Sequence, residues 1–275
     1  MPAVNSMDFS GKDTVLDVVR KEAGDFFRLV DDPDNWMVQT RCTEWQVRDI
    51  VGHMIDVTEG YLKRWEMARK GEEASALGLT VMADELNKGA QAVRSLPREE
   101  AIARLKEDYR QMMEIFDSLT EEQWSGQMIT HPFMGPLPSF FYPAFHVMDY
   151  GVHTWDIRYG LGEKVRKLDE PTAGVLIPYM LFALWPYTVD AGSAAGVDVT
   201  YGIEIAGEWG GKWLATVKDG QFKAEPYEGE FEGCEVVITF DPSDFVLTAF
   251  QRFPGGAARG EPDKIAQIRR LFFTI

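Results

Sequence analysis

Residues 146–156 read HVMDYGVHTWD, and this stretch decides how the first half of the chain folds. At about 100° per residue, a helix would place its two histidines and two aspartates within an arc of roughly 80°. The neighbouring arc would carry the hydrophobic side chains that face a core, namely Phe145, Met148, Val152, Trp155 and Tyr159. A solvated stripe would carry Lys, Glu and Gln, whereas this stripe holds only His and Asp, which are residue types that bind metals.

The spacing within this stretch predicts a metal site. Asp149 and His153 lie one helical turn apart, so both side chains can project towards a single ion. His53 lies at the edge of the apolar stripe of an earlier helix, on the side of Ile50 and Val57. If the two helices pack antiparallel, His53 lies opposite the pair. Two imidazoles and one carboxylate leave coordination positions open, as catalytic metal sites require.

Several alternatives stay open from the residues alone. An isolated helical histidine is more often a satisfied core or surface residue than a ligand. His146 could replace the carboxylate as a ligand, although it lies two turns from the second histidine of the helix. His131, in a Pro-rich loop, is either structural or an active-site base. Asp56 and Asp156, each three residues beyond a candidate ligand, could orient the imidazoles from behind.

Helical periodicity covers about the first 165 residues. Thr43 and Gln46 have the spacing of a capping box and predict a helix from about residue 44 to residue 70. Long helices without a strand pattern between them predict an up-and-down four-helix bundle. Further helices are predicted at about 14–30, 83–93, 97–119, 141–159 and 172–187.

The hydrophobic period changes to two in the last third of the chain. Residues 197–205 and 234–240 alternate between apolar and other side chains, as strands do. Asp219-Gly220 is a strong hairpin signal between two further strands. These segments predict a small domain with a mainly antiparallel sheet.

At 275 residues, the chain is long enough for two domains. The two patterns together predict the fold class α plus α+β. We expect a helical metal-binding bundle over residues 1–168 and a small α+β domain over residues 169–275.

The charge and cysteine content narrow the classes of partner and compartment. A net charge of −16 disfavours binding to nucleic acid or to an anionic membrane surface, so we expect a small-molecule substrate. Two cysteines, Cys42 and Cys234, form neither a disulfide framework nor a thiolate metal cluster. The N-terminus lacks the features of a signal peptide, which favours a cytoplasmic protein. The composition leaves open whether the protein is a monomer or a homodimer.

The two histidine-bearing segments resemble motifs of a known family. Residues 43–53, TEWQVRDIVGH, look like the W-x-V-x-D-h-h-x-H helix of DinB-like four-helix metal-binding domains. Residues 146–156 are similar to the E-x-x-x-H-x-W-D signature of mycothiol-dependent maleylpyruvate isomerases. Members of that family carry the bundle in front of a sterol-carrier-like α+β module, which is the layout expected here. Asp149 stands where this branch usually has Glu, so the charge is kept but the reach is shorter.

The resemblance implies a metal-dependent enzyme that activates an exogenous low-molecular-weight thiol such as mycothiol. The implied ligands are His53, Asp149 and His153, with zinc as the first candidate metal and nickel, manganese or iron as alternatives. Because neither cysteine lies in the His/Asp stripe, the thiolate would come from outside the chain. The family presents an arginine from the second domain to the substrate, for which Arg252 and Arg259 are candidates.

The implied activity is isomerisation of a small electrophile, or transfer of the thiol to it. Two other functions remain alternatives. The same ligands could activate water in a hydrolase, or the chain could bind a metal and an apolar ligand without catalysis.

Overall fold

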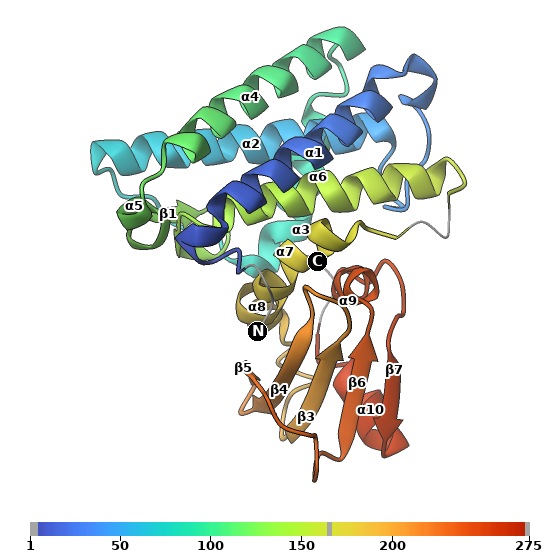
Figure 1. The fold of residues 1–275 in the computed structure, drawn as a ribbon. Coiled ribbons are helices and arrows are strands. Elements are labelled where there is room, and N and C mark those ends of the chain that lie inside the picture. Colours follow the sequence, from blue (N-terminus) through green and yellow to red (C-terminus); the bar gives the residue numbers. More distant parts are fainter. Residues whose placement is uncertain (1–4, 164–166, 273–275) are drawn as a thin grey trace. The chain divides into compact units, whose positions relative to one another are not determined.

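The structure is a computed structural model that describes residues 5–163 and 167–272 (Figure 1). The chain forms two compact units. One is Met7–Arg166, and the other is Lys167–Ile275 together with Met1–Ser6. Within the described residues, no helix has the length and apolar character needed to cross a membrane.

Four long helices build the first unit, and α1 packs along α6 while α2 packs along α4 (Figure 1). A short helix, α3, packs on α2, and a further short helix, α5, leads into a two-stranded antiparallel hairpin. The elements are α1 (Lys12–Asp31), α2 (Val47–Lys70), α3 (Met82–Ala92), α4 (Arg98–Ser118), α5 (Glu121–Gly126), β1 (Met128–His131), β2 (Gly135–Pro138) and α6 (Phe141–Gly160). The predicted helical first half is confirmed.

The start of α2 differs from the prediction. The helix begins at Val47 rather than near residue 44, and its N-cap is Gln46. The Gln46 backbone N–H donates to Asp49 Oδ2 at 2.9 Å, so the capping pair predicted for Thr43 and Gln46 is wrong. Residues 39–46 instead form a closed loop, in which Gln39 and Gln46 pair as an isolated β-bridge. The helix ends at Gly71, whose φ of 67° is the left-handed conformation that favours glycine at a helix C-terminus.

The second unit contains a five-stranded sheet in the order β5-β4-β3-β6-β7. The β3–β6 pair is parallel, and the other neighbouring strands are antiparallel. Asp219 and Gly220, with φ of 50° and 74°, form the predicted turn between β4 and β5. The strands are β3 (Asp198–Ile205), β4 (Gly211–Lys218), β5 (Gln221–Pro226), β6 (Val236–Phe240) and β7 (Ala257–Gly260). The predicted fold class, a helical part followed by a mainly antiparallel sheet domain, is confirmed.

The helix predicted near residues 172–187 is broken into three pieces. They are α7 (Glu170–Tyr179), a π-helical turn (Met180–Leu184) and α8 (Trp185–Thr188). Pro178 and Pro186 each lack the N–H that would continue the regular hydrogen-bond ladder, which accounts for the irregular geometry between them. Two short helices complete the unit, α9 (Pro242–Ala249) and α10 (Pro262–Arg269).

Close packing of α2 against α3 depends on Gly52, the residue before His53. A Cβ at Gly52 would collide with the backbone carbonyl oxygen of Ala90 and lie 2.7 Å from a methyl group of Val93. We expect Gly52→Ala to lower the free energy of unfolding by about 1–3 kcal/mol, because the clash is with backbone and cannot relax through a rotamer. Urea denaturation measures the change.

Gly60 is the matched control on the same helix, because a Cβ there meets nothing within 4 Å. Gly60→Ala should raise stability by about 0.5–1 kcal/mol through helix propensity alone. Equal effects of the two substitutions would contradict the close approach of α3 to α2.

Asp108 on α4 is a buried acid, 7% exposed, whose Oδ2 has no hydrogen-bond partner in the described part of the chain. Burial, with the nearby charge of Glu59, raises the pKa of Asp108 to about 6. Because the pKa is raised on folding, stability falls as the pH rises from about 4 to about 6. Asp108→Asn should therefore stabilise the protein at pH 7.5 by up to about 3 kcal/mol, and by much less at pH 4.

Urea denaturation at the two pH values measures this difference. Glu107→Gln is the control, because hydrogen bonds from Arg110 and Gln111 lower the pKa of the Glu107 carboxyl to about 2. That variant should show no stabilisation at pH 7.5. A pH-independent effect of Asp108→Asn would contradict the buried-acid interpretation.

Candidate metal centre

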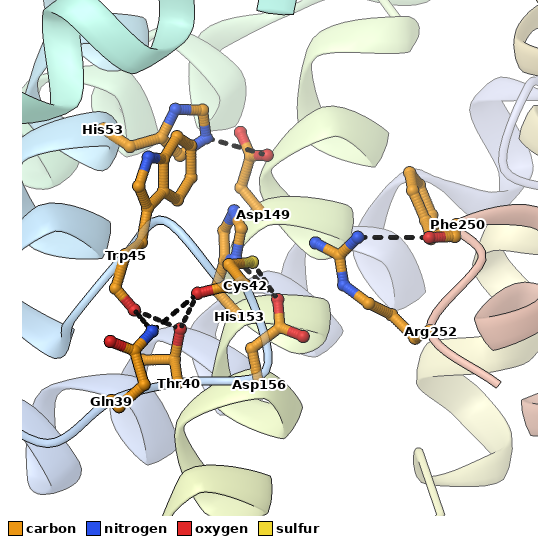
Figure 2. Close-up of polar contacts among 10 residues, drawn as sticks. All are labelled: Gln39, Thr40, Cys42, Trp45, His53, Asp149, His153, Asp156, Phe250 and Arg252. Atoms are coloured by element: carbon orange, nitrogen blue, oxygen red, sulfur yellow. Dashed lines mark hydrogen bonds and ion pairs between the residues drawn. The ribbon is translucent and has the colours of Figure 1, made fainter. Parts of the chain in front are cut away.

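The structure brings His53 on α2 together with Asp149 and His153 on α6 (Figure 2). One ligand atom from each residue lies within 4.8 Å of the others. His53 Nε2 is 3.8 Å from Asp149 Oδ1, and the centroids of the two imidazoles are 5.1 Å apart. The three side chains are 5%, 6% and 7% exposed. Two imidazole nitrogens and one carboxylate oxygen at these separations fit a divalent ion after a small contraction.

The N-terminal end of α2 is anchored by an ion pair between a buried aspartate and a partly exposed arginine. The Asp49 carboxylate, which is 0% exposed, accepts hydrogen bonds from Arg94 Nε at 2.5 Å and from Arg94 Nη2 at 3.0 Å. Arg94 follows α3, so the pair ties α3 to the turn of α2 that precedes His53. This contact raises the pKa of Arg94. His53 is therefore presented by a helix whose first turn is held in place.

Asp156 lies directly behind His153. His153 Nδ1 is 3.0 Å from Asp156 Oδ2, and the Asp156 side chain is 0% exposed. This hydrogen bond places the proton on Nδ1 and leaves Nε2 as the lone-pair donor, which Figure 2 shows on the side of Asp149. Burial lowers the pKa of His153, which favours the neutral imidazole that a metal requires.

Asp56 does not play the matching role for His53. Within residues 5–163 and 167–272, no hydrogen bond joins the two side chains, and His53 Nδ1 is buried without a partner. The Asp56 side chain is exposed and lies against Gly89 of α3. The prediction that an aspartate orients the histidine three residues before it is therefore confirmed for Asp156 and His153, and it is wrong for Asp56 and His53.

Trp45 lies against both imidazoles. Its ring centroid is 4.9 Å from that of His53 and 5.9 Å from that of His153, with interplanar angles of 34° and 48°. Its Nε1 donates to Asn87 Oδ1 of α3 at 3.0 Å, which fixes the indole. A residue outside the polar stripe thus covers one side of the site, and its signal in the sequence is the first position of the W-x-V-x-D-h-h-x-H motif.

His146 lies outside the ligand group. Its Nδ1 contacts the Tyr142 carbonyl oxygen at 3.1 Å, and its ring meets Phe116 edge-on at 5.0 Å between centroids. Burial lowers the pKa of His146. The grouped ligand atoms come from His53, Asp149 and His153, so the geometry favours the carboxylate over His146.

His131 ends β1 and closes the hairpin turn. Its Nδ1 accepts the backbone N–H groups of Phe133 and Met134, each at 3.2 Å, so its Nε2 carries the proton and lies 3.4 Å from the Tyr61 hydroxyl. Burial lowers the pKa of His131 to about 4. These contacts favour the structural interpretation of His131 over the role of a loop base.

Cys42 lies beside the site, although its position in the sequence gives no sign that it does. Its thiol donates to Asp156 Oδ2 at 3.2 Å (Figure 2). Cys42, His153 and Asp156 also form a group whose ligand atoms lie within 4.8 Å of one another. The cysteine is not on the helix that carries the stripe, but a loop brings its sulfur to it.

Arg252 and Arg259 belong to the other compact unit. Arg252 follows α9, and its Nη1 donates to the Phe250 carbonyl oxygen at 3.1 Å (Figure 2). Arg259 is exposed on β7, opposite Val237 in the register. Their role towards a substrate carboxylate stays a prediction.

Asp156→Asn is expected to weaken metal binding by about 10- to 100-fold, because the neutral amide no longer holds His153 in one tautomer with a charged acceptor. Competition with a chromophoric chelator measures the affinity. Asp56→Asn is the matched control, three residues beyond the other histidine, and should bind metal like the unmodified chain. Equal losses in the two variants would contradict a specific role for Asp156.

Comparison with known proteins identifies a matching family and structures of similar fold. The sequence matches the family described as the mycothiol maleylpyruvate isomerase N-terminal domain over residues 18–158. A comparison with curated proteins gives no significant match. The crystal structure of the mycothiol-dependent maleylpyruvate isomerase is similar, with a TM-score of 0.60 and 14% identity over 91% of this chain and 94% of that chain.

A histidine-to-alanine mutant of that isomerase is similar to the same degree, with a TM-score of 0.60 and 13% identity over 91% of this chain and 94% of that chain. At such identity the structural likeness shows the fold alone. The family match is stronger evidence of relationship, because it covers more than half of the 275 residues and contains all three grouped side chains. The resemblance seen in the two motifs is confirmed, and this chain belongs to the mycothiol maleylpyruvate isomerase family.

Proposed function

We propose that this protein is a metal-dependent enzyme that uses a low-molecular-weight thiol, mycothiol or a close analogue, to isomerise a small electrophilic substrate. The observation that carries the proposal is the buried group of His53, Asp149 and His153. Membership of the family supports the general kind of reaction. The proposed setting is cytoplasmic, with a small molecule as the partner.

The donor set suits catalysis because it leaves coordination positions open. His53, Asp149 and His153 would hold a divalent ion, with zinc as the first candidate, and that ion would lower the pKa of a thiol or water so that a nucleophile forms at neutral pH. The chain's own part is to keep His153 in the Nδ1–H tautomer, through Asp156, and to cover the imidazoles with Trp45. Asp149 adds one negative charge, which offsets half the charge of a divalent ion.

Isomerisation requires a thiolate that adds to an activated double bond, rotation about the resulting single bond, and elimination. Addition forms a C–S bond and moves the π electrons towards the activating carbonyl group. Elimination breaks that bond and returns the thiol unchanged, so no oxidant or reductant is needed. We assign Arg252 and Arg259 as candidates to hold a substrate carboxylate, and Arg252→Ala or Arg259→Ala should then raise KM more than it lowers kcat.

Metal content tests the first half of the proposal. Elemental analysis should find about one equivalent of metal in the unmodified protein. It should find much less in His53→Ala and His153→Ala, because each substitution removes one proposed ligand. His146→Gln is the matched control, a buried histidine on α6 outside the ligand group, and should keep the metal. A protein that stays metal-free after incubation with zinc, nickel and manganese would rule out the site.

Thiol dependence tests the second half. Turnover of maleylpyruvate, the substrate in the name of the similar isomerase, should require both the metal and an added thiol, with mycothiol, glutathione and cysteine compared. Metal-dependent turnover of esters or amides without thiol would instead identify a hydrolase. Metal binding with no turnover of either kind would favour a binding protein.

A further inference from the structure

The loop of residues 39–46 is closed by several hydrogen bonds between its own residues. Gln39 Nε2 donates to the carbonyl oxygens of Cys42, Thr43 and Trp45 at 2.9, 3.2 and 2.9 Å. Thr40 Oγ1 donates to the Trp45 carbonyl oxygen at 2.7 Å. These bonds, drawn in part in Figure 2, give the loop one conformation.

The same loop is tied to the backbone of α6. The Arg41 backbone N–H donates to the Asp156 carbonyl oxygen at 3.1 Å. A Cβ at Gly160, one turn further along α6, would collide with the Gln39 carbonyl oxygen, so the loop and the helix are in close contact. The Cys42 thiol is therefore held at a fixed place relative to the Asp156 side chain.

Asp156 Oδ2 accepts from two donors, His153 Nδ1 at 3.0 Å and Cys42 Sγ at 3.2 Å. The Asp156 side chain is fully buried, so its oxygens need hydrogen-bond donors from the protein. The two donors approach one oxygen from different elements, α6 and the loop. A carboxylate held from both sides has less freedom to rotate than one held by the imidazole alone.

We propose that Cys42 is a positioning residue for the metal centre, which acts through Asp156 to fix the tautomer and orientation of His153. The expected effect on metal affinity rests on the proposed function, whereas the effect of Cys42 on the orientation of Asp156 and His153 does not. The hydrogen-bonded series Cys42 Sγ–H, Asp156 Oδ2 and Nδ1–H of His153 is formed by residues of this chain alone. A thiol is a weak donor, so its effect is smaller than that of the aspartate.

Three variants test the role: Cys42→Ala removes the donor, Cys42→Ser keeps a hydrogen-bond donor, and Cys234→Ala removes the other cysteine, which lies in the other compact unit. Nitrogen-15 chemical shifts of the His153 ring report its tautomer in metal-free protein. We expect a single Nδ1–H tautomer in the unmodified chain, in Cys42→Ser and in Cys234→Ala, and a mixture in Cys42→Ala.

Metal affinity, measured by competition with a chelator using zinc, gives the second readout. Cys42→Ala should bind zinc about 3- to 10-fold more weakly, at or below the lower end of the effect expected for a direct partner of a ligand. Cys42→Ser should lie within about 2-fold of the unmodified chain, since a hydroxyl restores a donor. A structural loss alone would not be rescued by the serine in both readouts.

An unchanged tautomer and affinity in Cys42→Ala would overturn the proposal, and so would a serine variant that folds normally but behaves like the alanine variant. If Cys42→Ala does not fold, the serine variant compared with Cys234→Ala carries the test, and a tautomer mixture in the serine variant overturns it. If the unmodified chain binds no zinc, the proposed function fails, yet the ring shifts of metal-free protein still decide the role of Cys42.

Discussion

Two imidazoles and one carboxylate lie buried in the helical unit of this chain, and the rest of that unit is arranged around them. Burying a polar group without a partner costs roughly 1–3 kcal/mol, so such a group persists only if partners or an ion offset the cost. Asp156 satisfies one nitrogen of His153, while His53 Nδ1 remains without a partner in the described residues. The ion proposed for this site would be the partner of the three donor atoms that face one another.

Residues of the loop before α2 contact this buried group at two places. Trp45 at one end lies against the two imidazoles, and Cys42 nearer the middle contacts the aspartate behind His153. Gln39 and Thr40 close the loop with their side chains, so both residues are carried on a rigid segment. Two of the long helices, α2 and α6, carry the three grouped side chains, and one short loop contributes residues that surround them.

Periodicity predicted the ligand-bearing helices because side-chain direction repeats every 3.6 residues. It could therefore place Asp149 with His153, and it could rank Asp156 as a residue behind the site. It could not decide between Asp56 and Asp156, since both have the same spacing from a histidine and only packing separates them. Asp56 is exposed beside Gly89, whereas Asp156 is enclosed by the loop.

The features that escaped prediction depend on contacts between distant segments. Cys42 lies in a loop without periodicity, and contacts of that loop with α6, among them the bond from Arg41 to Asp156, bring it to the site. The parallel pairing of β3 with β6 joins strands far apart in sequence, and neither strand carries a mark of its neighbour. The turn of π-helix after Pro178 was also missed, although the two prolines of that segment were its signal.

Likeness of fold does not by itself select a reaction, because the same nitrogen and oxygen donors can activate a thiol or a water molecule. The space and the polarity around the ion would decide whether a thiol or a water molecule is activated. In the helical unit, residues other than His53, Asp149 and His153 determine both properties. Trp45 covers the imidazoles with an apolar surface, which disfavours a freely hydrated site. The surroundings of the three grouped side chains therefore depend on the loop of residues 39–46 as well as on the two helices that carry them.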